Sequence, residues 1–322
     1  MGWWRWGFLL LPLAVVAPFL SDYRLYLLSW ALVFLIPGIG LNITLGYAGQ
    51  ISLAQAAFFG LGAYTTAILT LHDWPFWLAL PVGGLLAGVC GFILGFPALR
   101  VKDHYLAMVT LGFNIVIFVF LRNWRELTGG VNGLTPPRPT LGALDLSGDL
   151  SFYYVILVVA GVTVVSAQWV VQSQWGRAFR AIRENEIAAA AHGVSLRNYK
   201  TLAFALGALY AGIGGGLFGA LLGYIDPEAF SLARSLEFLI LVVVGGLGRF
   251  AGPFLGTLVV TVLPEALRAF GSLYLVIYAA LVLIIMLFLR QGLVLVLDGL
   301  LAVGRWLLKG SYRAVRYGTP GD

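Results

Sequence analysis

The sequence predicts an all-α polytopic membrane protein with about ten transmembrane helices, and three observations support this. Hydrophobic residues make up 60% of the 322 residues and charged residues only 11%, whereas soluble domains carry roughly 25% charged residues. Mean hydropathy is +0.93. The apolar residues also fall into runs close to the about 20 residues that a helix needs to cross a bilayer. We therefore expect residues 1–322 to form a single transmembrane domain.

Ten apolar runs give the expected spans in chain order. They lie near residues 7–21, 25–45, 54–71, 76–96, 104–121, 151–172, 201–222, 235–247, 253–270 and 272–289. The first run follows Arg5 and could be a signal peptide, but Pro12 and Pro18 interrupt it and no A-x-A cleavage site follows. We expect it to be retained as a span.

Positive charge predicts the orientation of these spans. With both termini inside, 14 of the 20 Lys and Arg residues face the cytoplasm and 6 face outward, and cytoplasmic loops carry such an excess. Residues 174–200 and the basic tail, residues 290–322, are then cytoplasmic. The net charge of +6 has the same explanation, so we expect contact with membrane lipid and no nucleic-acid partner.

Residues 174–200 form a long polar stretch between apolar spans, and we call this segment the hook. Its sequence predicts a helix, a glycine break and a second helix. Ala188 to Ala191 favour helix, Gly193 permits the left-handed conformation that ends a helix, and Ser195 can cap the next one. A structured cytoplasmic loop of this kind indicates a surface that a partner holds.

Two loops on the predicted outer face are more elaborate than simple connections. Residues 122–150 are rich in Gly and Pro, and residues 223–230 form a second, shorter loop. Long loops in compact proteins are usually functional. We expect an extracytoplasmic partner to dock here, with an inert linker as the alternative.

Glycine spacing predicts close packing of the spans. Small residues four apart let helix backbones approach each other in a membrane. Such residues are Gly84 and Gly88, Gly91 and Gly95, Gly212 and Gly216, Gly215 and Gly219, and the series Gly248, Gly252 and Gly256. We expect most of them to serve helix packing.

Polar and small residues combine at one span boundary, residues 42–55, which we call the helix break. A lipid-facing helix would not place Asn42, Gln50 or Gln55 there, because polar or irregular backbone at membrane depth needs protein or water around it. The stretch predicts a break between two helices that borders a pathway or gate. An ordinary turn at the cytoplasmic surface is the alternative.

Groups that could carry chemistry are sparse. Ion-coupled transporters usually keep carboxylates or a Lys near mid-membrane, whereas Glu237 and Glu265 are expected at the interfaces. The sequence has no G-x-S-x-G, H-E-x-x-H or P-loop motif, so we do not expect an enzyme or a P-loop ATPase. The three His residues and the single Cys90 are scattered, and no metal site is expected.

Several motifs resemble those of one transporter family. They are GYAGQISLAQAAFFGLGAY (46–64), DHYLAMVTLGF (103–113), ELTGGVNGL (126–134), GRAFRAIRENEIAAAAHG (176–193), and VGGLG (244–248) followed by GP (252–253). In this order, and over roughly residues 20–293, they are similar to permeases of branched-chain amino-acid ABC importers, in particular the LivM-like subunit.

The resemblance implies a multi-pass permease subunit in the inner membrane of a prokaryote, translocating small amino acids, with leucine, isoleucine and valine foremost. A second, homologous permease would complete the pathway. Two ABC ATPases would lie beneath, and an extracytoplasmic binding protein would deliver substrate. ATP and Mg would bind to the ATPases, so no cofactor is expected in this chain.

The residue patterns and the resemblance together give three groups of candidate residues. Coupling to the ATPase is expected at Arg177, Arg180, Arg183, Glu184, Glu186, Ala189, Ala190 and Gly193. The pathway or gate is expected at Asn42, Gly46, Tyr47, Gly49, Gln50, Ser52 and Gln55. Binding-protein docking is expected at Asn132, Asp226 and Glu228.

The hook departs from the family pattern at one position. Coupling loops of ABC permeases are often described as E-A-A-x-x-x-G. Aligned on Gly193, this chain has Ile187 where the pattern has Glu, and Glu186 lies one residue early. The resemblance therefore assigns the coupling loop but leaves the role of Glu186 open.

Alternatives remain for substrate and for class. Similar permeases handle urea, short amides or small organic acids, and no residue of this sequence decides among these solutes. An ion-coupled secondary transporter would transport without an ATPase, and a membrane scaffold would carry no solute at all.

Overall fold

The protein is described by a computed structural model that covers residues 11–98, 103–141, 144–145, 148–289 and 292–295. Within these residues the regular secondary structure is helical, apart from one antiparallel hairpin of two-residue strands, β1 (Thr140–Leu141) and β2 (Leu144–Asp145). The predicted all-α class is therefore confirmed, with this small hairpin as the exception. The basic tail lies outside the described residues, apart from residues 292–295.

The α-helices follow one another along the chain, and the longest connection, residues 129–148, joins α6 to α7. They are α1 (Leu11–Val16), α2 (Asp22–Leu41), α3 (Gln55–Leu71), α4 (Phe76–Ala98), α5 (Asp103–Asn123), α6 (Arg125–Thr128), α7 (Asp149–Gln172), α8 (Gln174–Glu184), α9 (Glu186–Ala191), α10 (Leu196–Leu222), α11 (Leu232–Gly245), α12 (Gly252–Thr257), α13 (Leu263–Leu267) and α14 (Tyr274–Phe288).

Six helical segments among the described residues are long and apolar enough to cross a membrane, so the chain is polytopic. They are residues 22–47, 76–96, 105–123, 149–172, 196–222 and 252–271. Helices α3 and α14 are apolar but shorter, and α11, expected as a span over 235–247, has 14 residues. The expected first span, 7–21, is described only from residue 11.

The expected span over 253–270 is not a regular helix. It consists of α12, a π-helical turn (Leu258–Val262), α13 and a 3₁₀ segment (Arg268–Leu273). Gly271 has a φ of +61°, which turns the chain into α14. Changes of helix type of this kind bend a helix because they interrupt its regular hydrogen-bond ladder.

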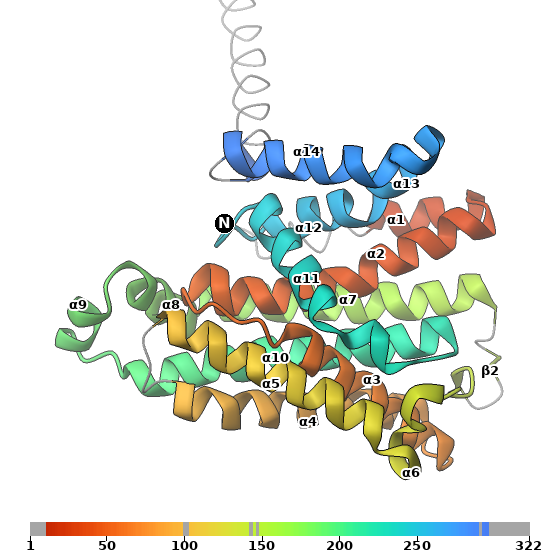
Figure 1. The fold of residues 1–322 in the computed structure, drawn as a ribbon, viewed down its shortest axis with the longest axis horizontal. Helices are drawn as coiled ribbons and strands as arrows, with labels where there is room; N and C mark the ends of the chain where they lie inside the picture. The colour runs from red at the N-terminus through yellow and green to blue at the C-terminus, as the bar shows by residue number, and fades with distance from the viewer. Residues whose placement is uncertain (1–10, 99–102, 142–143, 146–147, 290–291, 296–322) are drawn as a thin grey trace, which may run out of the picture.

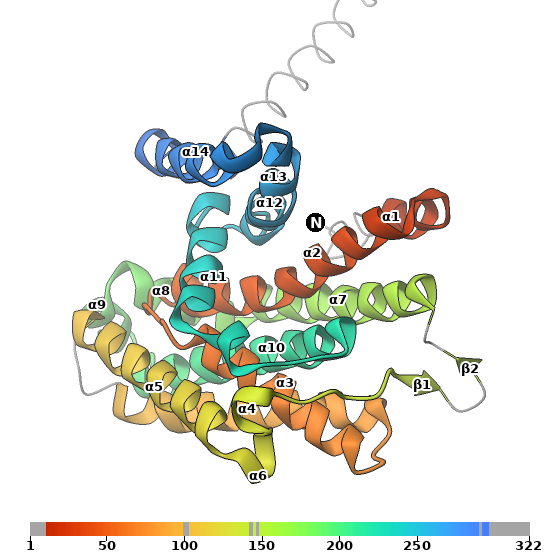
Figure 2. The ribbon, with the colours of Figure 1, turned by 45° about the vertical axis from the view of Figure 1, so that its right-hand side comes forward.

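Helix α10 lies at the centre of the bundle. It packs against α2, α3 and α4, while α7 covers α2. Helices α12 to α14 lie on the far side of α11 from α3, α4 and α5, in both views (Figures 1 and 2). The centre of the fold is therefore formed by α2, α3, α4 and α10.

Glycine makes the close approach of α4 to α10 possible. A Cβ on Gly91 of α4 would lie 2.9 Å from the carbonyl oxygen of Phe204, and a Cβ on Gly88 would lie 3.2 Å from Cβ of Leu209. The glycine spacing thus predicted helix packing correctly here. Gly248 is different, because it lies in the loop after α11 rather than within a helix.

Aromatic rings fill the space between α2, α3, α10 and α11. Phe59 lies 5.1 Å from Phe218 and 5.2 Å from Phe238, and Phe34 lies 5.3 Å from Phe238, measured between ring centroids. All four side chains are at most 1% exposed. Rings at this separation add attraction beyond their buried area, so the four helices are held together from inside.

The two ends of the bundle differ. Helices α8 and α9 of the hook lie at one end, and α6 and the β hairpin lie at the other (Figure 1). The hook and the elaborate loops are therefore at opposite ends of the long helices, as the predicted topology requires.

Candidate functional site

The helix break is a change of helix type followed by non-helical chain. Helix α2 continues into a π-helical segment, Asn42–Tyr47, and residues 48–54 are not helical before α3 begins at Gln55. Gly49 has a φ of +73°, which favours glycine. The predicted break is confirmed. Short π-helical segments are frequent at functional sites.

The polar side chains of the helix break are inside the protein. Asn42, Gln50, Ser52 and Gln55 are each 2% exposed, and Tyr47 is 5% exposed. These side chains are therefore not exposed on the free surface of the chain. Contact of these residues with a translocation pathway stays a prediction.

Two of these side chains join segments that are distant in sequence. Nε2 of Gln55 donates a hydrogen bond to the carbonyl oxygen of Pro37 in α2, at 2.8 Å. Nδ2 of Asn42 donates to the carbonyl oxygen of Arg249 at 3.0 Å, and its Oδ1 accepts from the amide of Gly248 at 2.9 Å. The helix break is thus tied to the loop between α11 and α12.

The hook has the predicted helix, break and helix, with an additional cap. Oδ1 of Asn185 accepts a hydrogen bond from the amide of Ala188 at 3.0 Å and starts α9. Gly193 has a φ of +82°, which confirms the predicted left-handed break. Ser195 occupies the N-cap position of α10, but its side chain makes no capping bond, so that prediction is wrong. The sequence signal for Asn185 was present, since Asn is a preferred N-cap residue.

The hook buries one face and exposes the other. Phe179 and Ile182 of α8 are at most 1% exposed, and Ala189 of α9 is 5% exposed. Ile187 is 84% exposed, and Ala190 is exposed. Ala189 was expected to touch an ATPase, but it packs within this chain, so a partner would reach Ile187 and Ala190 instead.

The three hook arginines are all exposed but differ in their contacts. Arg177 is exposed, and Arg180 makes a long 3.5 Å contact from Nη2 to the carbonyl oxygen of Val171. Arg183 instead donates from Nη1 to the carbonyl oxygen of Gly46 in the helix break. Of the three arginines expected to couple to the ATPase, Arg183 therefore also contacts the helix break of its own chain.

The acidic residues of the hook also differ from one another. Glu186 forms an ion pair with Lys200 of α10 at 2.5 Å, which holds α9 against the N-terminal part of α10. Glu184 is exposed. Glu186 thus has a contact within this chain, and Ile187 stands exposed at the position where the family pattern has its acid.

The two outer loops lie against each other, and we call residues 122–141 and 223–231 the outer surface. Leu134 and Ile225 pair as an isolated antiparallel bridge, and the hydroxyl of Tyr224 donates to the carbonyl oxygen of Asn132 at 3.1 Å. Arg122 and Glu228 form an exposed ion pair at 3.5 Å. Asp226 accepts from the amide of Ala229 at 3.1 Å and so starts a 3₁₀ turn.

The structure brings together the three residues predicted for docking, because they all lie on this outer surface. Asn132 is exposed, and the Glu228 side chain is 63% exposed. Asp226 is partly buried and has a structural role as a cap. Val131, 61% exposed, and Tyr224, 44% exposed, add apolar area beside them.

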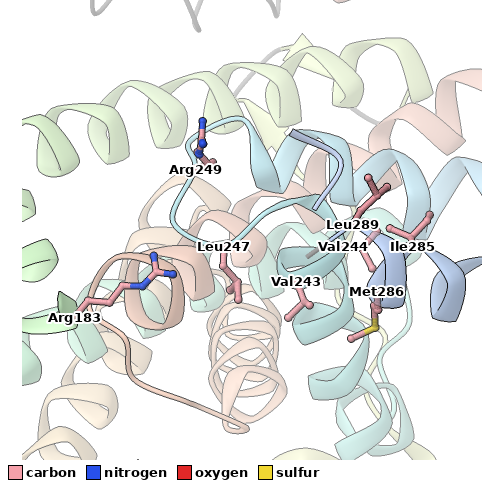
Figure 3. A pocket seen from close by; sticks show the side chains of 8 residues that line it. All are labelled: Arg183, Val243, Val244, Leu247, Arg249, Ile285, Met286 and Leu289. Carbon is pink, nitrogen blue, oxygen red and sulfur yellow. The ribbon is translucent and has the colours of Figure 1, made fainter. Parts of the chain in front are cut away.

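A cavity of 340 Å³ lies where the hook, the loop after α11 and α14 meet (Figure 3). It is lined by Arg183, Val243, Val244, Leu247, Arg249, Ile285, Met286 and Leu289. Sequence reasoning did not predict this cavity. The VGGLG motif over residues 244–248 was the available signal, because its glycines form the sharp loop that carries Leu247 and Arg249.

Comparison with known proteins gives the family. A family model described as "Branched-chain amino acid transport system / permease component" matches residues 23–289. The chain belongs to this permease family. The LivM permease protein of the high-affinity branched-chain amino acid transport system of Escherichia coli K12 is 34% identical over 310 residues, covering 88% of this chain and 73% of that protein.

More distant relatives carry similar names. A probable branched-chain amino acid transport permease protein, LivM, of Methanocaldococcus jannaschii is 23% identical over 272 residues, covering 72% of this chain and 77% of that protein. The LivH permease protein of E. coli K12 is 25% identical over 248 residues, covering 72% of this chain and 80% of its own. No solved structure matches the permease.

Proposed function

We propose that this permease translocates branched-chain amino acids as one subunit of a binding-protein-dependent ABC importer. The observation that carries the proposal is the 34% identity, over 88% of the chain, to a protein named as a permease of branched-chain amino acid transport. The hook supports it, because a capped, helical loop with an exposed apolar residue suits docking on an ATPase. The sequence has no P-loop, which supports the binding of ATP and Mg by separate subunits.

The proposed topology has ten spans in the inner membrane of a prokaryote, with both termini in the cytoplasm. The excess of Lys and Arg at the hook end supports this orientation. Helices α3, α11 and α14 would then cross as short spans, and residues 7–21 would provide the first. The outer surface would face the binding protein.

The proposed mechanism is alternating access. Closure of two ATPases on ATP moves the hook, and the hook tilts the spans that flank a pathway shared with a second, homologous permease. Gln50 and Ser52 of the helix break would lie nearest this pathway and would offer hydrogen bonds to a passing solute. The permease itself would hold the route and transmit movement, with no chemical step of its own.

Reconstitution of the whole importer tests the proposal. The permease, its partner permease, the two ATPases and the binding protein are placed in proteoliposomes, and uptake of labelled leucine is measured with and without ATP. We expect ATP-dependent uptake that unlabelled isoleucine and valine compete with and that urea, acetamide and acetate do not.

Three results would contradict the proposal in different ways. Competition by urea, acetamide or acetate alone would move the substrate to a related class. Leucine uptake without the ATPases, driven by an ion gradient, would indicate a secondary transporter. No uptake of any of these solutes by an assembled complex would favour a scaffold.

A further inference from the structure

Three segments that are far apart in sequence meet at the hook end of the bundle. They are the helix break, the loop of residues 246–251 and the last turn of α8, which carries Arg183. Asn42 bonds to both Gly248 and Arg249, as described above. Arg183 bonds to Gly46, and Figure 3 shows it reaching from α8 toward the loop that carries Leu247.

Glycines make room for Arg183 on two sides. A Cβ on Gly49 would lie 3.1 Å from Cγ of Arg183, so the aliphatic stem lies against this residue. A Cβ on Gly248 would overlap Nη1 of the guanidinium. Both glycines also have positive φ, +73° and +72°. A residue larger than glycine at either position would therefore occupy the space in which the Arg183 side chain lies.

A third glycine, Gly46, lies where the helix break contacts the loop of residues 246–251. A Cβ on Gly46 would lie 2.5 Å from the amide nitrogen of Gly248 and would overlap Oδ1 of Asn42. The backbones of the two segments thus touch beneath the guanidinium. A displacement of one segment must displace the other, because packed backbone has no room to absorb it.

We propose that Arg183 is a positioning residue that passes movement of the hook to the helix break and to the loop of residues 246–251. The inference rests on the proposed function, in which an ATPase moves the hook. Phe179 and Ile182 fix α8 to the bundle, and Arg183 makes a polar contact from α8 to the break. A charge-assisted hydrogen bond is directional and strong enough to keep α8 and the helix break in the same relative position as the hook moves.

The test measures transport and hydrolysis together in the reconstituted importer. Arg183→Met keeps an unbranched stem over Gly49 and removes the donor to Gly46. We expect assembly and basal ATP hydrolysis to be retained, while leucine transported per ATP falls about tenfold, the size expected for loss of one hydrogen bond to a charged group. Arg183→Lys keeps one charged donor and should restore part of this ratio.

Two further variants separate transmission from general damage. Arg24→Ala removes an exposed arginine near the start of α2, outside the hook, the helix break and the loop of residues 246–251, and it should leave the ratio unchanged. The double variant Asn42→Ala, Arg183→Met should transport as much leucine per ATP as the poorer of the two single variants. The effects of two substitutions that interrupt the same transmission are not additive.

The possible results are distinct from those for the function itself. Wild-type importer without ATP-driven leucine uptake overturns the proposed function. A working wild-type importer in which Arg183→Met transports as much leucine per ATP as wild type overturns only this inference. Equal losses in Arg183→Met and Arg24→Ala, or independent losses in the double variant, also overturn it.

Discussion

A substitution at Gly193 would test backbone conformation alone, because packing does not restrict this position. Its φ is +82°, and a Cβ built on it would meet no atom within 4 Å. A side chain at this position would therefore fit in space and be opposed only by the backbone. Residues other than Gly lose roughly 1–2 kcal/mol in the left-handed conformation, and Asn is among the least disfavoured.

We expect Gly193→Val to uncouple ATP hydrolysis from uptake, because Val resists the left-handed break between α9 and α10. Gly193→Asn is the matched control and should keep most of the coupling. Leucine uptake and ATP hydrolysis are measured in the same proteoliposomes. Equal ratios for Gly193→Val and wild type, in a well-assembled complex, would contradict a coupling role for this break.

At the scale of the element, α9 presents one face to the bundle and one to a partner. Ala189 is buried, Glu186 is paired with Lys200, and Ile187 is 84% exposed. An exposed Ile on a capped helix suits burial on another protein. Full burial of an Ile side chain is worth about 1.5–3 kcal/mol.

We therefore expect Ile187→Glu to weaken ATPase binding by about tenfold or more, since each 1.4 kcal/mol is tenfold in affinity. Binding of the ATPase to the permease pair is measured in detergent by biolayer interferometry. Ala188→Glu, an exposed neighbour on the same helix, is the control and should weaken binding less. Tighter binding of Ile187→Glu would instead mean that the ATPase offers a site for an acid, as the family pattern suggests.

The packing of α4 on α10 makes a second prediction at this scale. Gly91→Ala would place a methyl group 2.9 Å from the carbonyl oxygen of Phe204, and overpacking of this kind costs about 1–3 kcal/mol. Gly112→Ala in α5 is the control, because nothing lies within 4 Å of its added Cβ. Thermal unfolding in detergent should show a lower midpoint for Gly91→Ala and an equal or higher one for Gly112→Ala. A similar midpoint for both would contradict the close approach.

At the scale of the whole molecule, the hook and the outer surface lie at opposite ends of the bundle (Figure 1). The outer loops are joined by the Leu134–Ile225 bridge and the Arg122–Glu228 ion pair. They therefore form one surface rather than two independent connections. A binding protein would meet both loops at once.

We expect single cysteines at Asn132 and Glu228, in a Cys90→Ala background, to crosslink to the binding protein. Both positions are exposed. A cysteine at Asp22, exposed at the start of α2, is the control and should crosslink less. Crosslinked bands on gels after addition of the binding protein give the measurement. Stronger crosslinking at Asp22 than at either loop would place the docking surface elsewhere.

The pathway gives the second prediction at this scale. Gln50 and Ser52 are 2% exposed, so cysteines there should react slowly with a small water-soluble maleimide in this conformation. Reactivity should change when ATP is trapped in the ATPases, because alternating access opens the break in one state. Ala190→Cys, at an exposed residue of the hook, reports general access of the reagent. If cysteines at Gln50 and Ser52 react equally in all states, the helix break does not border the translocation pathway.

The sequence by itself determined the membrane class, the positions of most long helices, the helix break and the left-handed Gly193. These features depend on local composition, the spacing of apolar residues and the conformations that each backbone unit allows, all of which can be read along the chain. The helix-packing glycines of α4 were predictable for the same reason, since small residues four apart share one face.

Only the tertiary structure decided which face of each element is exposed and which contacts the rest of the chain. It placed Arg183 on Gly46, Asn42 on Gly248, Glu186 on Lys200, and one outer loop against the other. It also exposed Ile187 and buried Ala189. Asn42 and Gly248 are 206 residues apart, and a contact between such residues follows from how the helices pack rather than from the pattern around either one.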